Sequence, residues 1–411
     1  MNRWFHYSWV VLAMGTMVVF GSLGLARFGY TVVLPSMQAS LGIENSQSGA
    51  LATANLVGYL ALSVIGGALA SRFGPRAVIT GGLALAGTSM VLTGTAEGFI
   101  AAMVWRAVAG VGSGMSNVPV MGLISSWFGI RRRGFAAGIA VAGSSVALIF
   151  LGPVVPKILA HYGDEGWRAC WYIFGTVTLL IAAGAYFLLR NSPDELGIGA
   201  LGVSEDDPPP QDKAAALEWG LVYQSGRVWL LGFVYVAFGF SYIIYMTFFF
   251  KYLVSEGGYT RETAGTLFML VGWLSLFCGL VWGTISDYIG RKRALMLVYI
   301  IQAASFSLFA LWSAPAGYTV SAVLFGLTAW SIPAIMAAAC GDVLGPRLAP
   351  AALGFITLFF GIGQALGPSV AGIMADATGS FDSAFLLAGG VALLGAGGAF
   401  MIRDSNRRGV S

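Results

Sequence analysis

The sequence predicts an all-helical membrane protein with twelve transmembrane helices, arranged as two pseudo-symmetric bundles of six. Three observations predict this fold class. Of the 411 residues, 57% are hydrophobic and only 10% are charged, whereas roughly a quarter of the residues in a soluble domain are charged. Apolar stretches of about 20 residues, the length of a helix that spans a bilayer, follow one another along almost the whole chain. Short patterns also recur in the two halves at an offset near 216 residues, which indicates an internal duplication.

The predicted spans are separated by short polar or charged segments. They fall in two groups of six: 8–36, 47–71, 77–96, 99–126, 134–160 and 168–190, then 227–252, 262–286, 294–313, 316–341, 351–375 and 382–402. The segment between the groups is rich in Pro, Asp and Glu, which is typical of a solvated linker. We therefore expect an N-terminal bundle over residues 1–190, a cytoplasmic linker over 191–226 and a C-terminal bundle over 227–411.

The lysine and arginine residues predict the orientation of these helices, because cytoplasmic loops of membrane proteins retain positive charge. With both termini in the cytoplasm, sixteen basic residues lie in cytoplasmic loops and tails: Arg3, Arg72, Arg76, Arg131, Arg132, Arg133, Arg190, Lys213, Arg227, Arg291, Lys292, Arg293, Arg347, Arg403, Arg407 and Arg408. Four lie on the outer side: Lys157, Arg168, Lys251 and Arg261. We expect a multi-pass protein of the plasma (inner) membrane with cytoplasmic termini. This distribution also explains the net charge of +4 without a nucleic-acid partner.

The residues that usually build metal or catalytic sites are sparse. Three cysteines lie singly in apolar stretches, and the two histidines, His6 and His161, lie near helix ends. Neither residue type has the spacing of metal ligands, and the chain has no phosphate-binding loop. We expect a monomer with no metal, no cofactor and no enzymatic activity. The runs Arg131–Arg133 and Arg291–Arg293 are suited to anionic membrane lipids, although topology alone explains them.

The internal duplication rests on two pairs of segments. Residues 67–76 match residues 283–293, and Gly152-Pro153 in the fifth span is mirrored by Gly367-Pro368 in the eleventh. Proline removes a backbone hydrogen bond and kinks a helix, while glycine lets a neighbouring helix approach closely. The second pair therefore predicts either kinks about which the two halves rock or simple close packing.

These segments resemble the major facilitator superfamily, whose second-to-third loop carries a G-x-x-x-D-R-x-G-R-R-like pattern that recurs after the eighth helix. The second copy here keeps the acidic residue, Asp287, whereas the first copy has Ser71 in its place. The resemblance implies transport by alternating access, with Arg72, Asp287 and Arg291 in a conformational switch, and Ser71 implies a weaker latch in the N-terminal half. The run Arg106-Ala-Val-Ala-Gly-Val-Gly resembles the fourth-helix R-x-x-x-G-x-G motif of the superfamily.

A narrower resemblance covers residues 127–144, which are similar to the fifth-helix signature of monocarboxylate transporters and to the matching region of the oxalate/formate antiporter. The chain departs from the monocarboxylate transporters in two ways. Its first helix lacks their acidic, glycine-rich signature, and its eighth span, residues 264–285, has no Asp–Arg pair. The stretch 26–35 resembles instead a bacterial branch of the superfamily.

Two arginines lie within predicted spans, Arg27 in the first and Arg106 in the fourth. An arginine near the centre of a transmembrane helix costs about 2.5–3.5 kcal/mol even on the mild insertion scale, so it normally faces a cavity and a counter-charge. All 18 acidic residues fall in loops, in the linker or near helix ends. We therefore expect a net positive cavity that receives an anion. Two alternatives stay open: Arg106 serves helix packing or conformational change, and Arg27 extends to the outer surface.

Helical spacing suggests further residues that line the same cavity. The candidate substrate contacts are Arg27, Tyr30, Thr31, Asn55, Tyr59, Arg106, Asn117, Tyr242, Tyr245, Trp330 and Gln364. For any one of the aromatic residues, lipid contact or helix packing is an equal alternative, and Gln364 is also suited to an interhelical hydrogen bond. We expect a secondary transporter of a small organic anion, most readily a carboxylate, coupled to protons or to exchange of a counter-anion. The alternative is an exporter of neutral or anionic drugs or metabolites.

Overall fold

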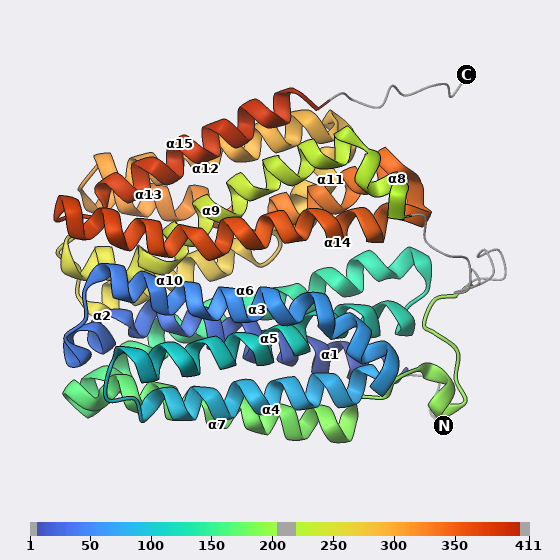
Figure 1. Cartoon of the computed structure of the whole chain (residues 1–411), viewed down its shortest axis with the longest axis horizontal. Coiled ribbons are helices and arrows are strands. Elements are labelled where there is room, and N and C mark those ends of the chain that lie inside the picture. The colour runs from blue at the N-terminus through green and yellow to red at the C-terminus, as the bar shows by residue number, and fades with distance from the viewer. Residues whose placement is uncertain (1–5, 204–218, 403–411) are drawn as a thin grey trace. The chain divides into compact units, whose positions relative to one another are not determined.

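The computed structural model describes residues 6–203 and 219–402, and almost all of these residues are helical (Figure 1). The elements are α1 (Ser8–Val19), η1 (Phe20–Phe28), α2 (Gly29–Leu41), α3 (Asn45–Phe73), α4 (Pro75–Gly94), α5 (Phe99–Trp127), α6 (Ile130–Tyr162), η2 (Gly163–Glu165), α7 (Gly166–Leu188), η3 (Pro193–Leu196), α8 (Trp219–Gln224), α9 (Gly226–Ser255), α10 (Arg261–Ser275), α11 (Cys278–Ile289), α12 (Arg291–Leu311), α13 (Pro315–Gly326), α14 (Ser331–Thr378) and α15 (Asp382–Phe400). The predictions for Arg3, Lys213, Arg403, Arg407, Arg408 and the acidic part of the linker lie outside the described residues.

The helices confirm the predicted class of an all-helical, multi-span fold. Within the described residues, nine stretches are long and apolar enough to cross a membrane, and eleven when two bent pairs of helices each count as one span. One of the nine, Arg132–Leu188, contains both α6 and α7, which are separated by the short turn η2. With these two helices counted separately, the described residues contain the twelve predicted spans. The long α14 likewise joins two spans across Gly345, whose φ of 77° is not helical.

The chain forms two compact units. The first takes in the described parts of Met1–Pro210 together with Thr247–Trp273, and the second the described parts of Gln211–Met246 together with Leu274–Ser411. In the first unit, α5 packs along α3 and α4, and α4 packs along α7, which lies beside it in Figure 1. In the second unit, α12 packs along α13 and α15, and α11 packs along α14.

The glycines of the fourth-helix motif place α5 tightly between its neighbours. A Cβ atom on Gly110 would overlap the backbone carbonyl of Asn55 in α3, and one on Gly112 would meet the backbone of α4 at Gly82 and Ala86. Small residues are enriched where transmembrane helices approach closely, because dispersion contacts rather than water exclusion hold such helices together. The motif therefore fixes the distance between α3 and α5, the two helices that carry Asn55, Tyr59, Arg106 and Asn117.

The first span is interrupted by a π-helical segment, η1, which the sequence analysis did not predict. Its hydrogen bonds run from residue i to i+5, and π-helical turns of this kind occur frequently at functional sites. Gly24 in this segment lies against Ala147 of α6, where a side chain on residue 24 would overlap the Cβ atom of Ala147. Arg27 lies in the last turn of η1. Arg27 therefore lies in an irregular part of the first span.

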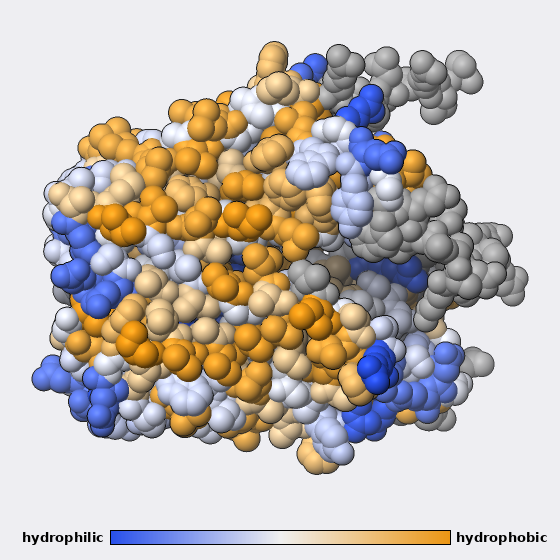
Figure 2. Space-filling model, viewed as in Figure 1, coloured by the Kyte–Doolittle hydropathy of each residue, from blue (hydrophilic) through white to orange (hydrophobic). Residues whose placement is uncertain are grey.

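Apolar side chains cover the flanks of the helices. Figure 2 shows hydrophobic residues along the helices on the visible face and polar residues gathered near the helix ends. Large exposed residues of this kind include Leu180 and Phe187 in α7, Phe233 in α9 and Leu394 in α15. Exposed apolar area on this scale requires an apolar solvent, which agrees with a bilayer around the helices.

Candidate functional site

Arg27 presents an unoccupied hydrogen-bonding edge within the N-terminal half. Its Cζ atom lies over the face of the Tyr59 ring in α3, 4.6 Å from the ring centre. The Nε and Nη2 atoms are buried and have no hydrogen-bond partner. These two nitrogens lie on the same edge of the group and form the fork that can hold a carboxylate through two parallel hydrogen bonds. Each buried donor left without a partner costs about 1–3 kcal/mol.

Arg106 in α5 is held inside the same unit by different contacts. Its side chain is 1% exposed, and Nη1 donates a hydrogen bond of 2.5 Å to the carbonyl oxygen of Ala26. The guanidinium carbon lies 4.6 Å from the centre of the Tyr30 ring and 5.1 Å from that of Trp171. Arg106 therefore joins the fourth span to the backbone of Ala26, the residue that precedes Arg27. The two guanidinium groups are also close enough to repel each other, so this region is strongly positive.

Three more candidate residues are buried, and two of them, Asn55 and Tyr30, contact Arg106. The Asn55 side chain donates to the carbonyl oxygen of Arg106 at 3.0 Å. The Tyr30 hydroxyl group donates to the carbonyl oxygen of Ser48 at 2.8 Å, and Thr31 is 2% exposed. Tyr30 and Asn55 thus use their polar groups to fix the helices around Arg106.

Asn117 completes the group around Arg27. Its Nδ2 atom donates to the Tyr59 hydroxyl oxygen at 2.9 Å, whereas its Oδ1 atom is buried and has no hydrogen-bond partner. Tyr59 therefore contacts Arg27 with its ring and Asn117 with its hydroxyl group. We call Arg27, Tyr59 and Asn117 the Arg27 cluster. It contains two free donors on Arg27 and one free acceptor on Asn117.

In the C-terminal half, Tyr242, Trp330 and Gln364 come together. Gln364 Nε2 donates to the Tyr242 hydroxyl oxygen, and the rings of Tyr242 and Trp330 meet edge to face with centroids 6.0 Å apart. Phe238 and Phe360 stack on the faces of Tyr242 at 4.7 and 5.9 Å between centroids. We call Tyr242, Trp330 and Gln364 the Tyr242 cluster.

Tyr245 has different neighbours from Tyr242, although helical spacing had suggested a shared face. Its side chain is 0% exposed, and its hydroxyl group is 2.8 Å from the Ser321 hydroxyl oxygen of α13. The rings of Phe306 and Phe325 surround it, with centroids 5.0 and 4.8 Å away. This environment favours a packing role for Tyr245.

No ion pair within the described residues includes Arg27 or Arg106. The described residues also contain no group of three His, Cys, Asp or Glu side chains placed to hold a metal ion. The chemistry available at the Arg27 cluster is therefore anion binding by hydrogen bonds and charge.

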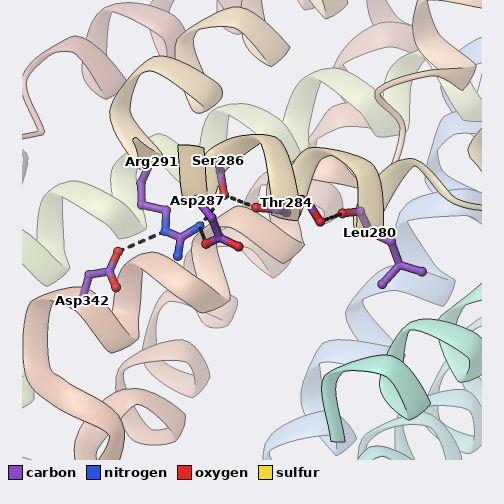
Figure 3. Close-up of polar contacts among 7 residues, drawn as sticks. Leu280, Thr284, Ser286, Asp287, Arg291 and Asp342 are labelled. Carbon is purple, nitrogen blue, oxygen red and sulfur yellow. Dashed lines mark hydrogen bonds and ion pairs between the residues drawn. The ribbon is translucent and has the colours of Figure 1, made fainter. Parts of the chain in front are cut away.

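A second polar site lies at the loop after the eighth span, where α11 meets α12. Figure 3 shows Arg291 between Asp287 of α11 and Asp342 of α14, with ion-pair distances of 2.5 and 3.0 Å. A further hydrogen bond of 2.5 Å joins Arg291 to the Ser286 hydroxyl group. Arg291 thus links the ends of three helices of the second unit. Asp342, 51 residues away in sequence, is a partner that sequence spacing gave no means of finding.

The first copy of the loop is built differently. Ser71, which replaces the acidic residue, donates to the carbonyl oxygen of Ala68 at 2.8 Å. The Arg72 guanidinium carbon lies 5.3 Å from the centre of the Phe73 ring, and no ion pair to Arg72 is present in the described residues. Arg76 instead donates from Nε to the carbonyl oxygen of Tyr186, near the C-terminus of α7, at 2.7 Å. A cation at that helix end is favourable because the last carbonyl groups carry partial negative charge.

Comparison with known proteins agrees with this architecture. A sequence model of the family described as "Uncharacterised MFS-type transporter YbfB" matches residues 19–399. The "Probable sulfoacetate transporter SauU" of Cupriavidus necator is 27% identical over 395 residues, covering 90% of this chain and 88% of that protein. Human "Monocarboxylate transporter 11" is 25% identical over 404 residues, covering 95% of this chain and 81% of that protein, which confirms the resemblance to the monocarboxylate transporters.

A solved structure of similar fold also supports this architecture. A bacterial homologue of the human lysosomal transporter Spinster superposes with a TM-score of 0.77 at 16% identity, covering 98% of each chain. Because the family model spans nearly the whole chain, the activity expected is transport and not enzymatic catalysis. The protein is therefore a multi-pass membrane protein that belongs to the major facilitator superfamily, in the family of YbfB-like transporters.

Proposed function

We propose that the protein is a secondary transporter of small organic anions, with Arg27 as the residue that binds the anionic group of the substrate. The observation that carries this proposal is the buried, unpartnered edge formed by Nε and Nη2 of Arg27. A carboxylate or sulfonate would accept a hydrogen bond from each nitrogen and would neutralise a charge that pairs with no acidic side chain in the described part of the chain. Both effects lower the free energy of the loaded state relative to the empty one.

The names of two relatives support the same class of substrate. Sulfoacetate carries a sulfonate and a carboxylate, and monocarboxylates carry one carboxylate. Each of these groups has the planar or tripodal oxygens that fit the fork of an arginine. The relatives are distant, so they support a class of anion and not a particular compound.

The remaining polar residues take two roles in this proposal. Arg106, Asn55 and Tyr30 hold the first, second and fourth spans in place around Arg27, through the bonds described above. In the C-terminal half, the Tyr242 cluster is the candidate for substrate contact, because it combines an amide, a hydroxyl group and aromatic rings. Alternating access of the two bundles would then expose the bound anion to one side of the membrane at a time.

We assign the conformational switch to the cytoplasmic loops. In the C-terminal half, Arg291 would hold Asp287 and Asp342 together in one state and release them in the other. The N-terminal copy of the loop would contribute less to the switch, since Ser71 has no charge and cannot form an ion pair with an arginine as Asp287 does. In this proposal the loops and both termini lie on the cytoplasmic side of the inner membrane, which the positive charge of the loops supports.

Uptake by purified protein in liposomes tests the function directly. Relative to the parent, Arg27→Gln loses two charge-assisted hydrogen bonds of about 1.5–3 kcal/mol each, so the affinity for a carboxylate should fall more than about 100-fold. Arg27→Lys retains the charge without the fork, and its affinity for a carboxylate should lie between those of the parent and of Arg27→Gln. Arg190→Gln, which alters an arginine bonded to the carbonyl oxygens of Phe187 and Leu189 at the end of α7, is the matched control and should transport like the parent. Unimpaired uptake of small carboxylates and sulfonates by Arg27→Gln would refute the proposal.

The same liposomes decide how transport is coupled. Proton symport predicts that uptake is faster when the outer solution is more acidic than the inside of the liposomes. Anion exchange predicts that uptake is strongly stimulated by substrate on the opposite side of the membrane. No acidic side chain lies in the middle of a span, and exchange requires no such group. Uptake that is insensitive to pH and strongly stimulated from the opposite side would exclude symport.

A further inference from the structure

The Arg27 cluster contains a hydrogen-bond acceptor that anion binding leaves unexplained. Asn117 Oδ1 is buried and has no hydrogen-bond partner, although the Nδ2 atom of the same amide is bonded to Tyr59. An amide oxygen has two lone pairs and can accept two hydrogen bonds. A buried acceptor without a donor is unfavourable, and the anionic group of a substrate cannot supply that donor.

Tyr59 fixes the position of this acceptor relative to Arg27. The guanidinium group of Arg27 lies over the tyrosine ring, and the Asn117 amide lies at the hydroxyl end of the same side chain. The free fork and the free acceptor therefore belong to two residues that contact the same tyrosine side chain. A small acid bound at the fork would extend its carbon chain along Tyr59 towards Asn117.

Resting on the function proposed above, we propose that Asn117 Oδ1 accepts a hydrogen bond from a hydroxyl group of the substrate. The transporter then selects hydroxylated carboxylates over the corresponding unsubstituted acids. A substrate without the hydroxyl group leaves Oδ1 unpaired inside the protein, and sites built to bind a hydroxyl group reject such analogues. A second carboxylate at the same position would meet the amide oxygen lone pairs and would also be disfavoured.

Rotation of the Asn117 side-chain amide by 180° would predict the opposite ligand preference. With its nitrogen and oxygen exchanged, the amide would accept from the Tyr59 hydroxyl group and offer a free N–H donor. The ligand would then be an acid with an additional acceptor, such as a keto group. Acids of equal length with a hydroxyl group, a keto group or neither group distinguish the two orientations.

The test measures binding of four acids to the purified full-length protein by thermal-shift titration: propionate, lactate, 3-hydroxypropionate and pyruvate. One hydrogen bond of ordinary strength corresponds to roughly a fivefold to thirtyfold difference in affinity. At least one hydroxy acid should therefore bind about fivefold to thirtyfold more tightly than propionate. Pyruvate should bind no more tightly than propionate. A preference for pyruvate over both hydroxy acids would overturn the proposal.

Variants connect the preference to Asn117. In Asn117→Leu, the ratio of hydroxy acid to propionate affinity should fall to about one, because the acceptor is lost. The matched control is Ser113→Ala, one turn away on α5, whose hydroxyl group is bonded to the carbonyl oxygen of Ala109; the control should keep the parental ratio. A ratio that persists in Asn117→Leu would overturn the proposal.

Two outcomes separate this proposal from the broader one. Equal binding of all four acids by the parent protein would overturn the hydroxyl preference and leave the anion transporter intact. Absence of binding of every acid, with sulfonate analogues included, would overturn the proposed function itself. Should Asn117→Leu fail to elute as a folded protein, the comparison of the four acids on the parent still decides the proposal.

Discussion

Replacement of Gly110 by alanine should separate α3 from α5 and disturb the Arg27 cluster. The added Cβ atom would overlap the backbone carbonyl of Asn55, which cannot rotate out of the way as a side chain could. Overpacking of this kind costs typically about 1–3 kcal/mol. Alanine also improves the intrinsic helix propensity by about 1 kcal/mol relative to glycine. The net loss of stability expected for Gly110→Ala is therefore at most about 2 kcal/mol.

Gly122 in the same helix is a matched control, because a Cβ atom at this position meets no other atom within 4 Å. Gly122→Ala gains the propensity of alanine without the overlap. The difference in stability between the two variants should therefore equal the packing cost alone, about 1–3 kcal/mol. Thermal unfolding of the two purified proteins in the same detergent measures this difference.

The transport assay adds a second readout. Asn55 donates to the carbonyl oxygen of Arg106, so that movement of α3 away from α5 would weaken this bond and shift Tyr59 relative to Arg27. Gly110→Ala should therefore bind carboxylates more weakly than Gly122→Ala. Equal unfolding midpoints and equal affinities for the two variants would refute the interpretation of the fourth-helix glycines as spacers for the site.

Two further predictions follow from the C-terminal half. Arg291→Gln should change the rate of transport while changing stability by less than about 1 kcal/mol, because partly exposed ion pairs contribute little to stability; parental transport kinetics would exclude Arg291 from the switch. Tyr242→Phe leaves the amide of Gln364 without its partner and should destabilise the protein by about 1–3 kcal/mol. The double variant Tyr242→Phe/Gln364→Leu should recover most of that loss in thermal unfolding, and simple additivity of the two single changes would contradict the bond.

Apolar length and loop charge were sufficient to predict the spans. Each predicted span corresponds to a helical stretch of the structure, although some stretches are broken and α14 joins two of them, because a bilayer requires about 20 apolar residues and excludes charged segments. The two intramembrane arginines were also visible in the sequence, since charged residues are rare in such spans. Their neighbours were partly visible: Asn55 in the second span and Asn117 in the same span as Arg106 were identified as candidate substrate contacts.

The sequence could not predict contacts that depend on irregular geometry. The π-helical segment η1 changes the number of residues per turn just before Arg27, and hydrophobic periodicity does not reveal such a change. Trp171 lies against Arg106 from a different helix, and a tryptophan in an apolar span gives no sign of this contact. Spacing on one helix also grouped Tyr242 with Tyr245, whereas the partners of these residues are set by α14 and α13 respectively.

The contact between Arg27 and Tyr59 explains how an arginine can be both fixed and available. A carboxylate placed within hydrogen-bond distance would occupy the fork, and every substrate would have to displace it. An aromatic ring instead attracts the cation over the face of the ring, with about 2 kcal/mol or more when the pair is desolvated. The Cζ atom lies over the ring, and the Nε and Nη2 atoms have no hydrogen-bond partner. Tyr59 can therefore hold Arg27 in the same place before and after an anion binds, which keeps the cost of ordering the side chain out of each transport cycle.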